Sequence, residues 1–148
     1  MMKEYVKMKY NKLIVSKVIK KSDILVVAMS DSKKMRKIIV NNKGYFTINC
    51  FYHDDKHPSM ILYPENNFYC LSCKQGGNVI SLFMKMHDMK FLESLETLAA
   101  AFDINLPKRS YIETNQELVV RLKEIRDSLK YKELIEKRKQ KTLKNSID

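Results

Sequence analysis

The sequence has few of the residues that build disulfide frameworks, rigid loops and membrane spans. Its 148 residues include three cysteines, three glycines, three prolines and no tryptophan. An odd cysteine count in a Lys-rich chain without a signal-peptide core predicts free thiols and a cytoplasmic location. The longest strongly apolar run, residues 24–29, is far shorter than the roughly 20 residues that cross a bilayer, so we expect no membrane contact.

Acidic residues are few relative to basic ones, and this imbalance is uneven along the chain. Twenty-eight Lys and Arg stand against 17 Asp and Glu, which gives a net charge of +11. Residues 1–44 and 108–148 are strongly basic, whereas residues 45–107 are slightly acidic. Basic surfaces attract polyanions over long distances, so the flanks predict contact with nucleic acid, with a merely solvated basic face as the alternative.

The sequence also lacks the clustered carboxylates with which nucleotide-polymerising enzymes bind magnesium. No Asp-x-Asp pattern occurs anywhere in the chain. We therefore expect no catalytic activity from this chain alone.

All three cysteines fall in one stretch with the spacing of a zinc site. Two residues separate Cys50 from His53, and two separate Cys70 from Cys73; a bridge of sixteen residues joins the two pairs. A two-residue gap lets both members of a pair reach one ion, and structural zinc takes four such ligands in a tetrahedron. One structural zinc ion is expected, although free buried cysteines are the alternative. His57 competes for the fourth position but lies seven residues after Cys50, so His53 is favoured.

The bridge between the two pairs has the pattern of a β-hairpin. Residues 59–63 and 68–69 are short apolar runs around the turn-forming segment 64–67, and they predict two antiparallel strands. Further strands are predicted near Val40 and Phe46. Such a hairpin would bring the second ligand pair back to the first.

Helical patterns flank the predicted sheet. Gly76 and Gly77 predict a tight turn with positive φ before a helix capped by Asn78. The predicted helices occupy part of 1–21, then 24–30, 79–86 and 91–102, and a long segment that a capping-box pattern opens at Thr114. The last helix is expected to dock on its own domain, with partner binding or dimerisation as the alternative. The candidate core residues on these helices are Phe83, Phe91, Leu95 and Phe102.

Together these patterns predict an α+β fold. It would be a zinc ribbon with a small antiparallel β-sheet flanked by helices, plus a long C-terminal helix. We divide the chain into a basic N-terminal extension (1–21), a zinc-binding domain (22–107) and a C-terminal basic helix (108–148). A monomer or weak dimer is expected.

The region 22–107 resembles the amino-terminal zinc-binding domain of bacterial DnaG-type DNA primases, which carries a CHC-type zinc finger. The residues that carry the resemblance are Cys50-Phe-Tyr-His53-Asp-Asp-Lys56-His-Pro58-Ser59-Met, Asn67-Phe68-Tyr69-Cys70-Leu-Ser-Cys73 and Gly76-Gly77-Asn78-Val79-Ile80. The chain departs from the family at Phe51, where proline is usual, and around the second pair, where an aromatic residue and glycines are favoured.

The resemblance implies a module that binds single-stranded DNA template on one face of its sheet and assists primer initiation in DNA replication. Single strands are held by base stacking on aromatic rings and by basic contacts to phosphates. The candidate contacts are Lys43, Tyr45, Lys56, Ser59, Phe68, Tyr69 and Lys74. Lys56 and Ser59 match family positions, whereas Lys43 and Lys74 follow from charge and location alone. For each aromatic residue, a place in the core is the alternative.

Other functions remain open at this point. The catalytic domain would be supplied by another chain, an arrangement that suits a phage or mobile element. A zinc ribbon that docks a replication partner, such as a primase catalytic domain, polymerase or helicase, is a second interpretation. A third is that the chain is an excised fragment of a complete DNA primase.

Overall fold

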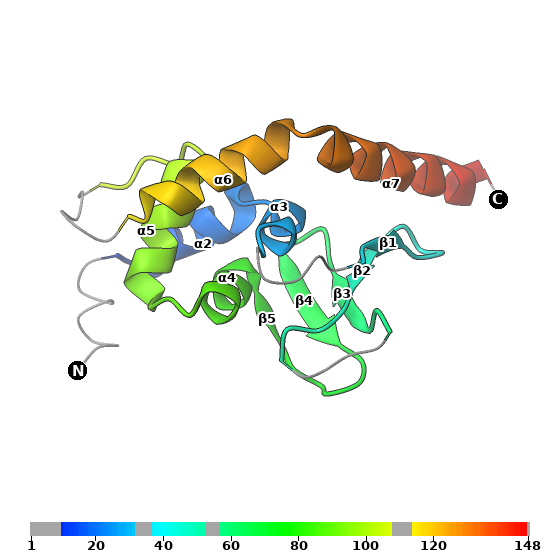
Figure 1. Cartoon of the computed structure of the whole chain (residues 1–148), viewed down its shortest axis with the longest axis horizontal. Helices are drawn as coiled ribbons and strands as arrows, with labels where there is room; N and C mark the ends of the chain where they lie inside the picture. Colours follow the sequence, from blue (N-terminus) through cyan, green and yellow to red (C-terminus); the bar gives the residue numbers. More distant parts are fainter. Residues whose placement is uncertain (1–9, 32–36, 53–56, 108–113, 148) are drawn as a thin grey trace.

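The computed structural model describes residues 10–31, 37–52, 57–107 and 114–147. Within these ranges the chain forms six helices and a five-stranded antiparallel sheet, which confirms the α+β prediction (Figure 1). The helices are α2 (Lys12–Lys21), α3 (Ile24–Met29), α4 (Val79–His87), α5 (Phe91–Ala101), α6 (Gln116–Asp127) and α7 (Leu129–Ile147). The strands are β1 (Ile39–Val40), β2 (Phe46–Ile48), β3 (Met60–Leu62), β4 (Asn67–Cys70) and β5 (Gly76–Asn78).

The sheet is a meander in which each strand pairs with its neighbour in sequence. The strand order is β1-β2-β3-β4-β5, and every pairing is antiparallel. The four strands predicted near Val40, Phe46, Ile61 and Phe68 are confirmed, whereas β5 was not predicted.

The prediction of a positive-φ turn at Gly76 and Gly77 is wrong. Both residues belong to β5, and neither has a positive φ. A Cβ on Gly77 would lie 2.8 Å from Ser81 Oγ, and one on Gly76 would lie 3.0 Å from the carbonyl oxygen of Phe68. Glycine is therefore required here because α4 and β4 approach the β5 backbone closely.

Alternating side chains give the sheet two different faces. The inner face is fully buried and consists of Phe46, Ile48, Met60, Leu62, Phe68 and Cys70. The residues between them are less deeply buried and form what we call the outer row, in which Ile39 pairs with Thr47, Thr47 with Ile61, and Ile61 with Tyr69. The outer row thus crosses four strands from the β1 edge towards β5.

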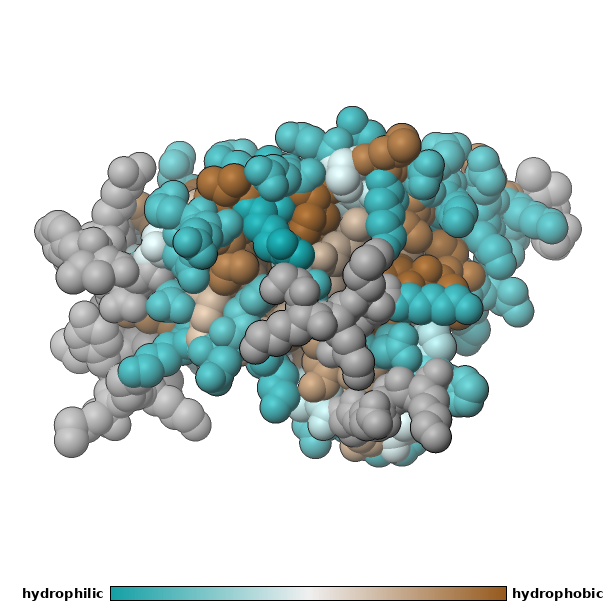
Figure 2. All heavy atoms as spheres, in the orientation of Figure 1, coloured by the Kyte–Doolittle hydropathy of each residue, from teal (hydrophilic) through white to brown (hydrophobic). Residues whose placement is uncertain are grey.

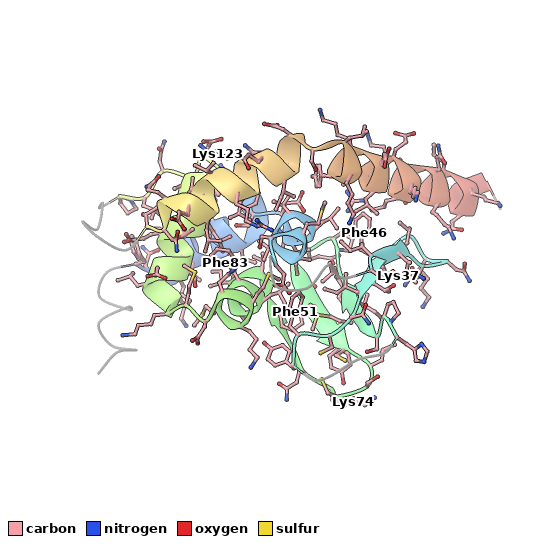
Figure 3. All side chains as sticks on the ribbon, in the orientation of Figure 1. Lys37, Phe46, Phe51, Lys74, Phe83 and Lys123 are labelled. Carbon is pink, nitrogen blue, oxygen red and sulfur yellow. The ribbon has the colours of Figure 1, made fainter. Side chains whose placement is uncertain are left out.

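The helices cover the inner face and build most of the hydrophobic core. Helix α4 packs on α3 and α5, and α6 packs on α5 and α3. Phe83 and Leu95 are completely buried, as predicted, whereas Phe91 and Phe102 are half-buried and pack against the rim of the core. Figure 3 shows Phe83 on α4 and Phe46 on the sheet. Among the described helices, none has both the length and the hydropathy to cross a bilayer.

The C-terminal segment packs against the rest of the chain, as the favoured interpretation predicted. Figure 1 shows α6 and α7 running one after the other along one side of the molecule. They form two helices because the backbone of Ser128 is extended, with φ −74° and ψ 152°. Val119 and Leu122 anchor α6, and Leu134 anchors α7, as buried side chains.

Candidate metal centre and sheet face

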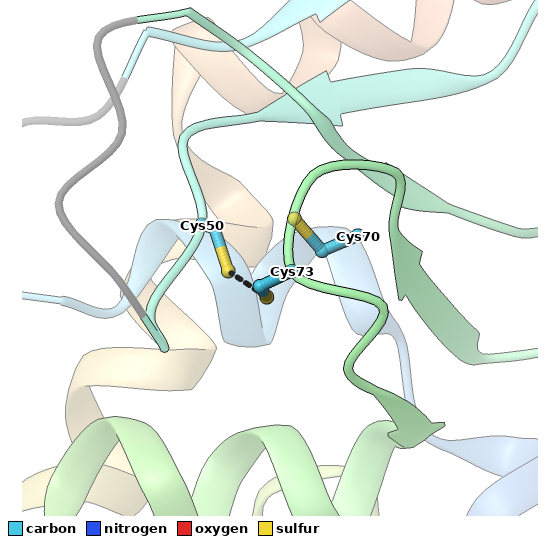
Figure 4. A group of neighbouring side chains, drawn as sticks. All are labelled: Cys50, Cys70 and Cys73. Atoms are coloured by element: carbon cyan, nitrogen blue, oxygen red, sulfur yellow. Dashed lines mark hydrogen bonds between the residues drawn. The ribbon is translucent and has the colours of Figure 1, made fainter.

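The three cysteines come together at one end of the sheet. Cys50 follows β2, Cys70 is the last residue of β4, and Cys73 lies in the turn between β4 and β5 (Figure 4). The pairing of Met60 with Cys70 continues as a hydrogen bond of 2.9 Å from the Leu71 amide to the Ser59 carbonyl oxygen. Strand register therefore places Cys70 and Cys73 beside Cys50.

The spacing of the thiols fits a tetrahedral metal site. The Sγ atoms of Cys50 and Cys73 are 3.7 Å apart, and all three sulfur atoms lie within 4.8 Å of one another. A zinc–sulfur bond of about 2.3 Å places two sulfur ligands of a tetrahedron about 3.8 Å apart. Cys50 and Cys70 are buried and Cys73 is half-buried, as suits a structural site closed to solvent.

Hydrogen bonds around the sulfur atoms favour their ionised form. The Tyr52 amide donates to Cys50 Sγ over 3.3 Å, and Ser59 Oγ lies 3.4 Å from Cys70 Sγ. The turn that carries Cys73 closes with a bond of 2.9 Å from the Lys74 amide to the Cys70 carbonyl oxygen, and Lys74 has a φ of 64°. Such contacts orient metal ligands and stabilise thiolates.

The thiols differ in their acidity in the metal-free chain. Burial raises the pKa of Cys50 to about 12, although the amide of Tyr52 opposes the rise. Burial also acts to raise the pKa of Cys70, but the amide of Cys73 and the hydroxyl of Ser59 outweigh it and lower the pKa to about 7. Cys70 therefore ionises more easily than Cys50. A bound cation would favour the thiolate form of both residues.

Within the described residues the candidate metal site consists of three cysteines, and no fourth ligand joins them. The favoured residue, His53, and the candidate DNA contact Lys56 both fall within 53–56, outside the described ranges. His57 is described and exposed, and it does not belong to the thiol cluster. The choice of His53 therefore stays a prediction.

The structure separates the other candidate contacts. Tyr45 and Tyr69 are half-buried and lie on the side of the sheet that carries the outer row, and Lys43 and Lys74 are exposed. Ser59 is half-buried beside Cys70. Figure 3 places Lys74 at the end of the sheet that is remote from α7.

Phe68 is not available as an exposed contact. Its side chain is 3% exposed, points to the inner face and stacks on Tyr52 with a centroid distance of 5.9 Å. The prediction for Phe68 is corrected by the strand register, which places its neighbour Tyr69 on the outer row instead.

The sequence analysis missed one aromatic residue of the sheet, Tyr63, whereas Tyr52 was already a candidate. Tyr63 contacts Tyr45 edge to face, with ring centroids 5.3 Å apart. Tyr52 lies beneath the ammonium group of Lys85, which is 5.4 Å from the ring centroid. The alternation Met60-Ile61-Leu62-Tyr63 could have identified Tyr63, because it places Tyr63 on the same face as Ile61.

An antiparallel sheet that brings two cysteine-bearing turns together defines a zinc-ribbon domain. A family model described as the CHC2 zinc finger matches residues 10–114. The chain therefore belongs to the CHC2 zinc finger family, and the resemblance to the zinc domain of DnaG-type primases is confirmed. Family membership and the cluster of three thiols both indicate zinc as the metal.

The similar proteins are bacterial DNA primases. The chain is 35% identical to the DNA primase of Campylobacter jejuni over 85 residues, which cover 57% of this chain and 14% of that protein. It is 34% identical to the primase of Buchnera aphidicola over 74 residues (49% and 13%) and 27% identical to that of Staphylococcus epidermidis over 100 residues (67% and 16%). The matched part of the chain thus spans only 13% to 16% of these primases.

Proposed function

We propose that this chain is a primase-type zinc-binding module that binds single-stranded DNA template and assists primer initiation in DNA replication. A catalytic domain on another chain supplies the polymerisation. The observation that supports this function best is the placement of the thiol cluster at the end of a sheet whose outer row and neighbouring positions present tyrosines. Aromatic side chains on a sheet are sequence-tolerant stacking platforms for unpaired bases.

The metal has a structural role in this proposal. One zinc ion held by Cys50, His53, Cys70 and Cys73 has no open coordination position for water or substrate. It fixes the turn 70–74, which carries the exposed Lys74, against the segment that follows β2. The Lys74 amide donates a hydrogen bond to the carbonyl oxygen of Cys70, the residue after Tyr69, so Lys74 would contact a phosphate of a strand stacked on Tyr69. Lys43 at the β1–β2 turn and Lys56 are the other proposed phosphate contacts.

Fluorescence anisotropy with labelled oligo-dT at low and physiological salt tests the proposal. Tyr69→Ala should weaken binding about tenfold or more, because stacking on one base contributes roughly 1–3 kcal/mol. Tyr69→Phe keeps the ring and should retain the affinity. Lys74→Ala should weaken binding and reduce its salt dependence, whereas Lys90→Ala, an exposed lysine at the start of α5, is the matched control. No binding at low salt by the zinc-loaded protein would exclude the proposal.

A protein-docking zinc ribbon within a replication complex is the second candidate. It is favoured by Leu71, a large hydrophobic residue that is 54% exposed in the turn between the two cysteines of the second pair. Leu71→Ser should then abolish pull-down of a primase catalytic domain, polymerase or helicase while leaving the oligo-dT affinity unchanged. The DNA-binding proposal instead expects Tyr69→Ala, and not Leu71→Ser, to lower the oligo-dT affinity.

A further inference from the structure

The edge of the sheet and the C-terminal helix enclose a groove that the family relationship does not explain. The groove has a volume of about 450 Å³. Its apolar residues include Ile39, Val40 and Leu134, and its basic residues are Lys137, Lys141 and Lys144. Figure 2 shows hydrophobic atoms at the surface between α7 and β1 with hydrophilic side chains around them. We call this site the β1–α7 groove. Its helical wall lies beyond residues 10–114, which the family model matches.

Helix α7 is fixed against the sheet, so its lysines do not belong to a free tail. Leu134 is 6% exposed, and the guanidinium group of Arg138 lies 5.0 Å from the ring centroid of Phe46. Asn145 Nδ2 donates a hydrogen bond of 2.9 Å to the carbonyl oxygen of Asn42. These contacts hold the helix beside β1 at both ends of the groove.

The basic residues of the groove form one stripe along the helix. Lys137, Lys141 and Lys144 are spaced four and three residues apart, which places them on the same helical face. At 1.5 Å per residue the stripe is about 10 Å long, enough for about two phosphates of an extended strand. In the described part of the chain, no acidic side chain forms an ion pair with any of these three lysines. Their charge is therefore available to an external anion.

The groove continues the outer row of the sheet. Ile39 lines the groove and is also the last residue of the row that runs through Thr47 and Ile61 to Tyr69. Adjacent strands are about 4.8 Å apart, so Tyr69 on β4 lies about 14 Å from β1. Two or three nucleotides span this distance. A strand of this length stacked on Tyr69 would therefore reach Ile39, which lines the groove.

We propose that the β1–α7 groove binds the sugar-phosphate backbone of the same single strand that the sheet face holds, and so lengthens the binding site towards the C-terminal helix. This inference rests on the proposed function, because the strand enters the groove from the sheet. An acidic peptide could also match three lysines over an apolar floor. The continuity of the groove with the aromatic row favours DNA.

The test compares two double variants by anisotropy with labelled dT4 and dT12. Lys137→Gln with Lys141→Gln removes two charges from the groove. Lys132→Gln with Lys139→Gln removes two exposed charges from the opposite face of the same helix and serves as the matched control.

The groove variant should bind dT12 about tenfold more weakly than the wild type and lose most of the affinity gained between dT4 and dT12. Its log–log salt slope should fall by about 1.4, since each phosphate contact on a single strand contributes about 0.7. The control should change the dT12 affinity less than twofold.

Each failure has its own signature. If the two double variants weaken dT12 binding equally, or if the groove variant has no effect, the proposal that the groove binds DNA is overturned. The sheet face is then tested separately by Tyr69→Ala. Loss of dT12 affinity in the groove variant with no effect of Tyr69→Ala would mean that the groove binds DNA by itself, and it overturns both the sheet proposal and the continuity of the groove with the sheet face. If a polyglutamate peptide of equal charge displaces labelled dT12 as well as unlabelled dT12 does, the groove is an acidic-peptide site and the DNA assignment is wrong. No binding of dT12 to the wild type overturns both.

Discussion

Single residues join segments of this fold that are far apart in sequence, and Asn66 is the clearest case. It occupies the β3–β4 turn with a φ of 66° and is 7% exposed. Its Oδ1 accepts a hydrogen bond of 3.1 Å from the Ile24 amide, and its Nδ2 donates to the carbonyl oxygens of Ile19 and Ser22. One side chain thus connects the hairpin to the junction of α2 and α3.

Asn66→Ala should lower the free energy of unfolding by about 2–4 kcal/mol. It leaves buried backbone groups without partners, each of which costs roughly 1–3 kcal/mol. It also places alanine, which adopts the left-handed region less readily than asparagine, at a φ of 66°. Urea denaturation followed by circular dichroism measures the change. Asn67→Ala, at the exposed neighbouring position, is the control and should change stability by less than about 0.5 kcal/mol. A loss below 1 kcal/mol for Asn66→Ala would contradict this account.

Gly77→Ala should destabilise the chain by about 1–3 kcal/mol through overpacking. The added Cβ would lie 2.8 Å from Ser81 Oγ and 3.1 Å from Ser81 Cβ, in the first turn of α4. Ser81 also forms the capping box with Asn78, so the clash would disturb the cap as well. Thermal unfolding of the single variants and of Gly77→Ala with Ser81→Gly forms the test. The double variant should be more stable than additivity of the two single changes predicts, and strict additivity would exclude a direct clash.

Among the elements, α7 is attached to α3 through a charged hydrogen bond. Tyr131 Oη donates to Asp23 Oδ2 over 2.5 Å, while Asp23 Oδ1 accepts from the amides of Leu25 and Val26 at the start of α3. Burial, followed by the hydrogen bond to the Asp23 carboxylate, raises the pKa of Tyr131 above its ordinary value. The same carboxylate therefore caps one helix and holds another.

Tyr131→Phe should cost about 1 kcal/mol at pH 7, and this cost should shrink above pH 10. A phenol whose pKa is raised by folding keeps its proton when the unfolded chain has lost it. Its stabilising contribution is complete below the unfolded pKa of about 10 and is lost as the pH rises towards the folded pKa. Urea unfolding of wild type and variant at pH 7, 9 and 11 measures the difference, and the other tyrosines, common to both proteins, cancel. A constant difference across this range would show that Tyr131 titrates normally.

Local signals explain why most elements could be predicted from the sequence. Asp23 and Asn78 cap α3 and α4 as predicted, because each cap depends only on residues within one turn. Helix α6 is capped by Asn115, one residue after Thr114, where the capping-box pattern was predicted to open the helix. The strands around Phe46 and Ile61 follow from short apolar runs. The thiol cluster could also be predicted, because a two-residue gap joins Cys70 to Cys73 and the predicted hairpin returns both of them to Cys50.

Features that depend on tertiary contacts could not be predicted in this way. Strand β5 consists of Gly76, Gly77 and Asn78, which show no apolar alternation, and it forms because β4 provides an edge to pair with. Leu118, Leu122, Ile125 and Leu129 recur at heptad-like spacing in the sequence. Leu129 is nevertheless 71% exposed, since the chain turns at Ser128 before α7 begins. Phe68 was assigned to the wrong face because the phase of an alternating pattern is known only once the register is known.

At the scale of the whole molecule, the metal centre and the helical core stabilise different parts of the fold. The thiol cluster joins the β2 and β4 ends of the sheet. The helices contribute many of the fully buried side chains of the core, among them Leu25, Phe83, Leu95, Leu98 and Leu122. Burying each such side chain contributes roughly 1.5–3 kcal/mol. The burial of these side chains therefore stabilises the helices independently of metal binding.

Removal of zinc should consequently loosen the sheet before the helices. In an excess of chelator at neutral pH, the near-ultraviolet dichroism of the sheet tyrosines should weaken, while most of the helical signal at 222 nm remains at 20 °C. The apparent Tm should fall by 10 °C or more, since structural zinc contributes several kcal/mol to folding. Binding of dT12 should fall at least tenfold, because Tyr69 and Lys74 lose their fixed positions. Cys70→Ser without chelator should reproduce all these changes, and Ser72→Ala, an exposed neighbour in the same turn, should reproduce none. A single cooperative loss of both dichroism signals on zinc removal would instead mean that the helices depend on the metal centre.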